Sequence, residues 1–415
     1  MMAVSLNTDV NQRRYRGLPE LGSRALFPTL EVPVYLNHGS LSPISEAVQA
    51  SINEVLAGYA SRGMGWYAVE TERRERLRAN LAGMLSADQG EIALVGNTTA
   101  GIQAIALGLD WQPADRVLLL EGEFPTNVMP WLQAARNHDL QTVWMEAEAF
   151  RLDRAGALER LEAELSRGVR LMAISAVQFA TGQRMPLEVI GELCRRFGTE
   201  LFVDAIQALG VVPLDVKALG IDYLACGSHK WMMGPEGAGL LYVDAARAGR
   251  LNPQLAGWLS CEDPFAFLTR APGELRYDRP LRRDARLFEA GTPNSIGLAG
   301  LEASTALLTE LGIDSIFDHV QSWLGALEPA LVECGFESAR MGGKEGRSGI
   351  LSVRPPDPAL APAWAAALGA QGVACASPDG WIRFSPHWPN ALSEVDTVVT
   401  AVDEIIAAGG PGQIT

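Results

Sequence analysis

The stretch ACGSHKWMMGPEGAGLLYV, residues 225–243, places one lysine between two apolar runs. Such runs are typical of buried strands, and the turn GPEGAG between them is too short for a crossover helix. One of the two strands is therefore expected to run antiparallel to the other. Lys230 directly follows the first of them. A single lysine at such a place is most often a solvated loop residue, so its role depends on its surroundings.

Further apolar segments of the same kind alternate with amphipathic ones such as residues 98–109 and 186–198. Short apolar strands joined by helices predict an α/β fold, with a mostly parallel sheet covered by helices on both faces. We expect seven strands in this sheet, at residues 91–96, 115–124, 141–147, 170–179, 200–206, 222–228 and 237–243.

The pattern changes after about residue 260. Residues 261–286 are polar and typical of a loop, and a long helical pattern runs from residue 295 to about residue 334. Three further strands are expected, at residues 349–355, 372–377 and 381–387. We therefore predict three parts: an N-terminal segment (1–60), a large α/β domain (61–262) and a small C-terminal α+β domain (263–415).

Composition excludes several classes of function. The net charge of −15 argues against non-specific binding to nucleic acids and against docking on anionic membranes. The five cysteines are scattered without a CxxC pair, so neither a disulfide framework nor a zinc site is expected. Residues 1–17 contain no apolar core of a secretion signal, and a cytoplasmic protein without a metal site is the expectation.

Parallel sheets bind ligands beyond the carboxyl ends of their strands, so residues at those ends are candidates for a site. Asp204 follows the apolar run LFV, and a buried carboxylate there needs a partner: a helix N-terminus, a metal ion or a protonated ring nitrogen. Thr98 and Thr99 begin a predicted helix, where they either cap it or hold a phosphate. The other candidates at strand ends are Phe124, Gln178, Ser228, His229 and Lys230.

Taken together, these residues provide the binding groups that one ligand requires, pyridoxal 5'-phosphate. Thr98 and Thr99 would hold its phosphate and Phe124 would lie against its ring. Asp204 would keep the ring nitrogen protonated, so that the ring accepts electrons, and Lys230 would form a Schiff base with the aldehyde. No P-loop and no GxGxxG motif is present to suggest a nucleotide instead.

The blocks VDAIQALGVVPLDV and GSHKWMMGPEGAGLLYV resemble the class V aminotransferase family of fold type I pyridoxal-phosphate enzymes, and the resemblance covers nearly the whole chain. It implies that Asp204, His229 and Lys230 are catalytic, that Gln207 binds the ring hydroxyl and that His229 helps to bind the phosphate. Many cysteine desulfurases carry a phosphate-binding serine where this chain has Gly227, and we expect Ser228 to take its place.

The same resemblance implies further contacts with cofactor and substrate. Thr292, in the block FEAGTPN, would reach the phosphate in a neighbouring subunit, which implies a homodimer with shared sites. Arg383, in the block RFSPH, would pair with the substrate carboxylate, as a planar guanidinium does well. The other residues expected to line the substrate pocket are Asn37, His38, Trp66 and Tyr67, while Gln178 and Ser228 are expected to contact the cofactor.

Features of several subgroups occur side by side. YLNHGS resembles the isopenicillin N epimerase group, whereas EFPTN and VQFATGQ resemble kynureninase. Cysteine desulfurases stack a histidine on the ring where Phe124 stands here, and they carry a nucleophilic cysteine on a loop before the arginine. Cys375 precedes Arg383 by only eight residues, and we interpret it as a buried structural cysteine.

The expected activity is therefore that of a pyridoxal-phosphate enzyme acting on a small amino-acid substrate. Transamination, epimerisation and β-elimination by a C–S lyase stay open. The alternative is a cysteine desulfurase or selenocysteine lyase that delivers sulfur to a partner protein through a cysteine. A catalytically silent binding module is the third hypothesis, and the presence of both Asp204 and Lys230 argues against it.

Overall fold

The computed structural model describes residues 18–270 and 272–411. Its centre is a seven-stranded sheet with strand order β2-β8-β7-β6-β5-β3-β4. All seven predicted strands are present. β8 runs antiparallel to both of its neighbours, as the short GPEGAG turn requires, and the other pairs are parallel. The strands are β2 (Ile92–Val95), β3 (Arg116–Glu121), β4 (Gln141–Glu146), β5 (Leu171–Ser175), β6 (Glu200–Asp204), β7 (Tyr223–Gly227) and β8 (Gly239–Val243).

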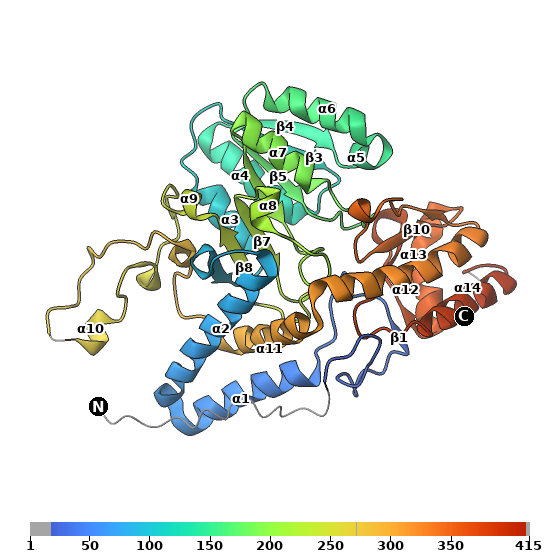
Figure 1. Cartoon of the computed structure of the whole chain (residues 1–415), viewed down its shortest axis with the longest axis horizontal. Coiled ribbons are helices and arrows are strands. Elements are labelled where there is room, and N and C mark those ends of the chain that lie inside the picture. The colour runs from blue at the N-terminus through green and yellow to red at the C-terminus, as the bar shows by residue number, and fades with distance from the viewer. Residues whose placement is uncertain (1–17, 271, 412–415) are drawn as a thin grey trace.

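Helices cover both faces of this sheet (Figure 1). In β5, Met172 and Ile174 join one apolar core whereas Leu171 and Ala173 join the other, because alternate residues of a strand point to opposite faces. The first core includes side chains of α6 (Arg154–Leu165) and α7 (Leu187–Phe197). The second includes those of α3 (Thr98–Gly108) and α4 (Met129–His138). Burial on both faces explains why the strands are continuous apolar runs.

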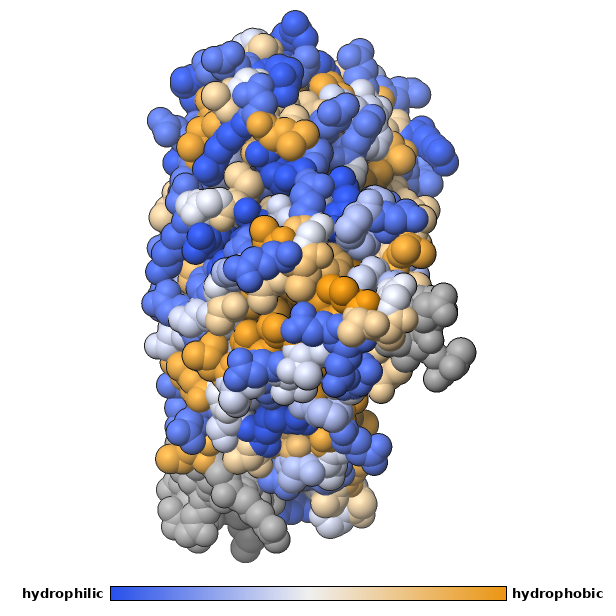
Figure 2. All heavy atoms as spheres, turned by 90° about the vertical axis from the view of Figure 1, so that its right-hand side faces the viewer, coloured by the Kyte–Doolittle hydropathy of each residue, from blue (hydrophilic) through white to orange (hydrophobic). Residues whose placement is uncertain are grey.

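The C-terminal part forms a smaller α+β unit. Its sheet has the order β12-β10-β9 and is antiparallel. The strand expected at residues 372–377 does not join this sheet but pairs in parallel with β1 from the N-terminal segment. The elements are β1 (Val34–Tyr35), β9 (Glu337–Ser338), β10 (Leu351–Arg354), β11 (Val373–Ala374), β12 (Ile382–Phe384), α13 (Ala361–Ala370) and α14 (Glu394–Ala407). Hydrophilic residues predominate on the face shown in Figure 2, with apolar residues between them.

The long helical pattern is two helices, α11 (Ser295–Leu311) and α12 (Ile313–Glu333), which meet at an angle of 77°. The bend falls at Gly312, whose φ of +78° is unfavourable for other residues. Within the described ranges, no single helix is long and apolar enough to cross a membrane, although this bent pair passes the same length and composition test together.

The N-terminal segment contributes α1 (Glu46–Arg62), which packs on α11 together with α2 (Tyr67–Leu85). Trp66, expected near the substrate pocket, is instead buried at the corner between α1 and α2, where its Nε1 donates to Glu70 at 2.8 Å. All strands of the large sheet fall between residues 61 and 262, and the domain boundaries themselves stay a prediction. Residues 1–17, on which the expectation about a secretion signal rests, lie outside the described residues.

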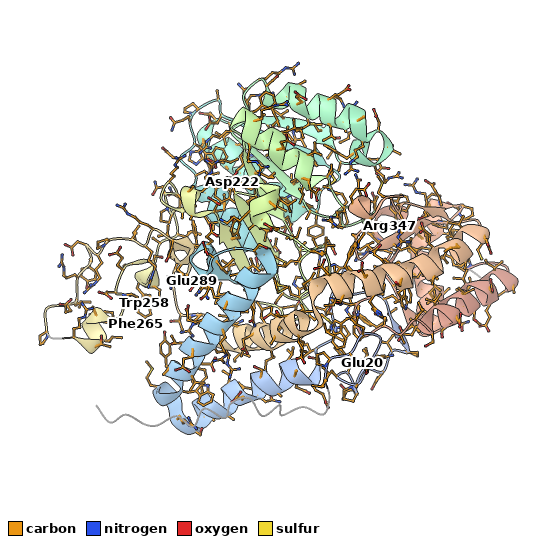
Figure 3. The ribbon with its side chains drawn as sticks, in the orientation of Figure 1. Glu20, Asp222, Trp258, Phe265, Glu289 and Arg347 are labelled. Carbon is orange, nitrogen blue, oxygen red and sulfur yellow. The ribbon has the colours of Figure 1, made fainter. Side chains whose placement is uncertain are left out.

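The predicted loop at residues 261–286 leaves the body of the molecule as a long excursion that carries the short helix α10 (Ala266–Thr269) (Figure 1). Beside this helix, the rings of Trp258 and Phe265 lie 5.2 Å apart (Figure 3). Both rings are still partly open to solvent, and Tyr277 further along the excursion is 94% exposed. The described part of this segment therefore presents apolar side chains outward.

Candidate active site

A cavity of about 480 Å³ lies beyond the carboxyl ends of the parallel strands and reaches the small C-terminal unit. It brings together many of the predicted residues from distant parts of the chain. The predicted residues that line it are Thr98, Thr99, Phe124, Asp204, Gln207, His229, Lys230 and Arg383. The other lining residues are Gly39, Ser40, Asn97, Thr126, Phe179, Ile206, Ala376 and Pro378.

Asp204 and Lys230 are the charged pair at the floor of this cavity. β6, which ends at Asp204, and β7, which precedes Lys230, are paired neighbours in the sheet. Burial raises the pKa of Asp204 to about 7, the charge of Glu123 adds to the rise, and Lys230 opposes it. Burial lowers the pKa of Lys230 to about 8, the charge of Arg383 lowers it further, and Asp204 opposes that change. The lysine is thereby brought close to its neutral, nucleophilic form near neutral pH.

One oxygen of Asp204 has no partner. Oδ1 accepts the N–H of Ile206 at 2.9 Å, but Oδ2 is buried without a hydrogen bond. A buried carboxylate oxygen in this condition is costly unless a ligand supplies a donor. A protonated ring nitrogen is such a donor, so the orphaned oxygen fits the pyridoxal ring expected from the sequence.

The backbone of Lys230 is held from the N-terminal segment. Ser42 donates its hydroxyl to the carbonyl of Lys230 at 2.7 Å and its N–H to the carbonyl of His229 at 2.8 Å. His38 Nδ1 lies 2.8 Å from Ser42 Oγ. His38 is thus a buried support beneath the lysine, not a lining residue as expected, and burial lowers its pKa well below the usual value.

Asn37 also differs from the expectation. It forms an isolated bridge with Ser385, its Oδ1 is buried without a partner, and it does not line the cavity. In this segment Gly39 and Ser40, which follow His38, are the residues that line the cavity.

The start of α3 forms the end of the cavity that suits a phosphate. Asn97 is the N-cap and accepts the N–H of Ala100 at 2.8 Å, so Thr98 and Thr99 are the first helical residues. Thr98 Oγ1 accepts the N–H of Gly227 at 2.9 Å, which leaves its own hydrogen free to donate. Free N–H groups, hydroxyls and the helix dipole favour an anion here.

Gly227 and Ser228 take different roles from the one expected. A Cβ on Gly227 would lie 3.3 Å from Thr98 Oγ1 and 3.4 Å from His229 Nδ1, so the glycine keeps these two groups close together. Ser228 is fully buried and donates its hydroxyl to the carbonyl of Pro235. It does not line the cavity, because its side chain fastens the following turn.

The walls beside the ring position are formed by Phe124 and Gln207. The Phe124 ring centroid lies 5.6 Å from Lys230 Nζ, and the Phe179 ring meets it edge-on at 5.4 Å. Gln207 Nε2 donates to the carbonyl of Gly39 at 2.9 Å, and Oε1 accepts Trp231 Nε1 at 2.8 Å. These two bonds fix the amide and leave its second N–H available as a donor, which suits a hydrogen bond to the ring hydroxyl that the resemblance implies.

Arg383, on β12 of the small unit, closes the opposite side of the cavity. It donates to the carbonyl of Phe179 and to Ser40 Oγ, both at 2.7 Å, while its buried Nε has no partner. Burial lowers the pKa of Arg383 to about 10, so it remains charged at neutral pH. A buried guanidinium with unused donor capacity is suited to a carboxylate ligand.

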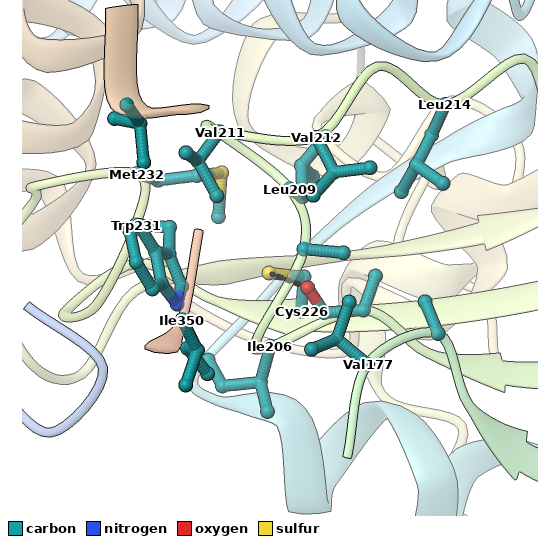
Figure 4. Close-up of a cluster of buried hydrophobic side chains, with 14 of the residues drawn as sticks. Val177, Ile206, Leu209, Val211, Val212, Leu214, Cys226, Trp231, Met232 and Ile350 are labelled. Atoms are coloured by element: carbon teal, nitrogen blue, oxygen red, sulfur yellow. Dashed lines mark hydrogen bonds between the residues drawn. The ribbon is translucent and has the colours of Figure 1, made fainter. Parts of the chain in front are cut away.

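None of the five cysteines lines this cavity. Cys375 follows β11, and burial raises its pKa to about 12 although the charge of Arg383 opposes the rise. Cys226 lies beneath the cavity among apolar side chains such as Ile206 and Val177 (Figure 4), and burial raises its pKa well above the usual value. Both thiols are therefore protonated at neutral pH and are poor nucleophiles.

Glu123 is a buried residue beside the cavity that was not predicted. It accepts the N–H of Ser175 at 2.7 Å, the hydroxyl of Ser175, and Nε2 of Gln178 at 3.1 Å. Gln178 is consequently turned away from the cavity, which explains why it does not contact the cofactor position. The signal in the sequence was a carboxylate at a strand end directly before Phe124.

Thr292 and Tyr67 lie in a different, larger cavity of about 540 Å³. It is bounded by α2, by the start of α3 and by the base of the excursion. Glu289, which Figure 3 labels beside α2, accepts two hydrogen bonds from Arg78 and one from the N–H of Leu94 at its edge. Thr292 therefore stands apart from the Lys230 cavity of its own chain.

Comparison with known proteins adds independent findings. The sequence matches the family described as Aminotransferase class-V over residues 34–378. The uncharacterized aminotransferase YcbU of Bacillus subtilis (strain 168) is 29% identical over 385 residues, covering 92% of this chain and 96% of that protein. A cysteine desulfurase of Klebsiella pneumoniae subsp. pneumoniae is 31% identical over 317 residues, covering 72% of this chain and 74% of that protein.

Solved structures show the same architecture. The cystine C–S lyase C-DES, in complex with its reaction product cysteine persulfide, matches with a TM-score of 0.81 and 25% identity over 90% of this chain and 98% of the lyase. A C-DES mutant with glycine covalently linked to its pyridoxal-phosphate cofactor matches with a TM-score of 0.82 and 24% identity over 91% of this chain and 98% of that chain. The likeness in fold thus extends over nearly the whole chain.

Proposed function

The chain belongs to the class V aminotransferase family and is a pyridoxal-phosphate-dependent enzyme of fold type I, and from this premise we propose that it is a C–S lyase that acts by β-elimination. The observation that carries the proposal is the lack of any cysteine among the residues that line the Lys230 cavity. A sulfur-delivering desulfurase needs a thiolate beside the substrate, whereas an eliminating lyase releases the sulfur with the leaving group.

The residues of the cavity divide the work of such a reaction. Arg383 and Phe124 line the cavity, where Arg383 would bind the substrate carboxylate and the Phe124 ring would pack against the cofactor. When bound, the cofactor withdraws electrons from the α-carbon of the amino acid attached to it, and Asp204 holds the proton on its ring nitrogen. Lys230 Nζ, whose pKa is lowered to about 8, accepts the α-proton and as an ammonium group can return it to the departing sulfur.

The substrate proposed is an S-substituted L-cysteine with a neutral side chain. The uncharged residues that line the cavity include Phe179, Ala376 and Pro378, together with the hydroxyl residues Ser40 and Thr126. These side chains carry no charge and leave no partner for an acidic or basic substituent. One substrate and one water would give pyruvate, ammonium and the free thiol.

Product analysis tests this proposal. Enzyme incubated with S-methyl-L-cysteine should form pyruvate, ammonium and methanethiol in equal amounts. Alanine together with a persulfide on the protein would instead establish the desulfurase alternative, which the similarity to cysteine desulfurases suggests. A keto acid that retains the sulfur would indicate transamination, and appearance of the D-enantiomer would indicate epimerisation; either result contradicts elimination.

A matched pair of cysteine variants separates the lyase from the desulfurase. Cys375→Ser alters the thiol on which the charge of Arg383 acts, and Cys334→Ser alters a partly exposed thiol next to Asp403. Both variants should retain the turnover of the parent enzyme. Selective loss of sulfur release in Cys375→Ser would show that this thiol takes part in the reaction.

We further infer that the enzyme is a cytoplasmic homodimer. Thr292 lies in the larger cavity, away from Lys230 of its own chain, which agrees with a role in the site of a second copy. Leu255, an exposed apolar side chain that lines that cavity, supports the same inference. Light scattering of the purified protein should give twice the mass of the chain, and a monomer with full activity would contradict the dimer.

A further inference from the structure

The buried carboxylate of Glu123 has no part in the reaction described above. Glu123 follows Gly122, whose φ of +89° turns the chain inward at the end of β3. Its side chain crosses to the end of β5, where Ser175 and Gln178 donate to it. Burial raises the pKa of Glu123, and the hydrogen bonds that Ser175 and Gln178 donate oppose the rise because they stabilise the ionised carboxylate.

Glu123 is joined to three walls of the cavity. Phe124, the ring wall, is the next residue in the chain, and Gln178 precedes Phe179, whose carbonyl accepts Arg383. Ser175 is the register partner of Asp204 across β5 and β6, and the N–H of Ala176 donates to the carbonyl of Asp204 at 2.8 Å. A single carboxylate therefore connects the strand ends that carry the ring wall, the support of Arg383 and Asp204.

The charge of Glu123 also reaches Asp204. The charged or titratable groups that act on Asp204 are Glu123 from the end of β3, and Cys226 and Lys230 from the end of β7, with Arg383 acting on Lys230 in turn. Glu123 is the only one of these described groups that adds a negative charge beside Asp204, because the Cys226 thiol is neutral in its apolar surroundings. A like charge at short range favours the protonated form of its neighbour.

We propose that Glu123 is a positioning residue for the cofactor, whose buried negative charge acts through Asp204 to keep the cofactor ring nitrogen protonated. The carboxylate holds the ends of β3 and β5 together, so the charge stays at a fixed place behind Asp204. With the cofactor bound, its ring nitrogen and Asp204 would share one proton, and a further negative charge would make that proton harder to remove. This role rests on the cofactor assignment, and it does not depend on which reaction the enzyme performs.

The test follows the protonation of the ring nitrogen in the holoenzyme without substrate. Enzyme reconstituted with ¹⁵N-labelled pyridoxal 5'-phosphate is titrated, and the nitrogen chemical shift gives the midpoint of deprotonation. Glu123→Gln removes the charge at nearly constant shape and should lower that midpoint by about 1 pH unit. Because no substrate is present, failure of the β-elimination proposal leaves this result unaffected, and the reverse also holds.

Glu200→Gln is the matched control. Glu200 is a buried carboxylate at the start of β6, the strand that ends at Asp204, and Arg170 and Arg247 pair with it. This change should leave the nitrogen midpoint as in the parent enzyme, although it removes a buried charge. Equal midpoints in Glu123→Gln and the parent, or the same displacement in Glu200→Gln, would overturn the proposal.

A second variant does not require Glu123→Gln to fold. Gln178→Met removes one of the donors that stabilise ionised Glu123, so the pKa of this carboxyl rises further and its negative charge is weakened. The nitrogen midpoint should then fall by a fraction of a pH unit, in the same direction as in Glu123→Gln. A midpoint that stays constant or rises would contradict the role assigned to Glu123.

Discussion

Asp204 and Lys230 stand at the ends of two neighbouring strands and each acts on the charge of the other inside one buried cavity. Burial works against both ionised forms: it raises the pKa of the carboxyl to about 7 and lowers that of the ammonium to about 8. In the cofactor-free protein this pair therefore destabilises the fold, because the attraction between the two charges does not offset the hydration energy that both lose on burial.

The first prediction concerns the pH dependence of stability in the cofactor-free protein. The folded pKa of Asp204 is raised above its unfolded value, so the folded state holds the extra proton between about pH 4 and about pH 7. The contribution of this group is fully present below about pH 4 and is lost as the pH rises through about 7. Urea unfolding of Asp204→Asn should show a smaller fall in the free energy of unfolding over this range; an unchanged fall would show that Asp204 is not its cause.

A second prediction separates Thr98 from Ser228 in cofactor binding. Thr98→Val removes the hydroxyl that faces the cavity, and we expect an affinity for pyridoxal phosphate about tenfold weaker, as for the loss of one hydrogen bond to a charged group. Ser228→Ala removes a hydrogen bond to Pro235 outside the cavity and should cost roughly 1 kcal/mol of stability with unchanged affinity. Fluorescence titration with the cofactor and urea unfolding measure the two effects. Weaker binding by Ser228→Ala would restore the expectation drawn from the sequence.

The strands were predictable from the sequence because both faces of the sheet are covered. β5, β6, β7 and β8 are buried at every position, so each contains an apolar run, which in β6 lies between Glu200 and Asp204. The positions of Asp204 and Lys230 follow from the same logic, since parallel strands end at one edge of the sheet. The family resemblance added Arg383, which lies on a strand of the other domain and has no local signal that assigns it to this cavity.

The directions of side chains in the connecting segments were not predictable in this way. His38 points away from the cavity because it packs on His387, which is distant in sequence and 5.4 Å away in ring separation. Gln178 was expected at the cofactor, but its direction is determined by Glu123, a residue of another strand end. Such directions depend on contacts between loops, and neither apolar periodicity nor motif spacing contains them.

A third prediction concerns Arg383 and the substrate. Arg383→Lys keeps a positive charge but loses the planar fork that matches a carboxylate, and it leaves Phe179 and Ser40 without their donor. We expect KM to rise about 10- to 100-fold while kcat changes by only a few fold. Steady-state kinetics with S-methyl-L-cysteine measures this, and Arg354→Lys, on the partly exposed end of β10, is the control. A fall in kcat at constant KM would assign Arg383 to the chemical step instead.

The last prediction concerns the corner between α1 and α2, which supports the N-terminal segment that reaches Lys230. Gly58 lies against the buried Trp66, and a Cβ there would come within 2.2 Å of the ring. Trp66 cannot move away easily, because its Nε1 is held by the buried Glu70. Gly58→Ala should therefore destabilise the protein by roughly 1–3 kcal/mol, as overpacking in a core does.

Gly83→Ala is the matched control. A Cβ at this position in α2 would have no atom within 4 Å, and the change should stabilise the protein by up to about 1 kcal/mol, since alanine favours a helix. Urea unfolding of both variants measures the difference, and equal stabilities would show that Trp66 adapts to the added methyl group.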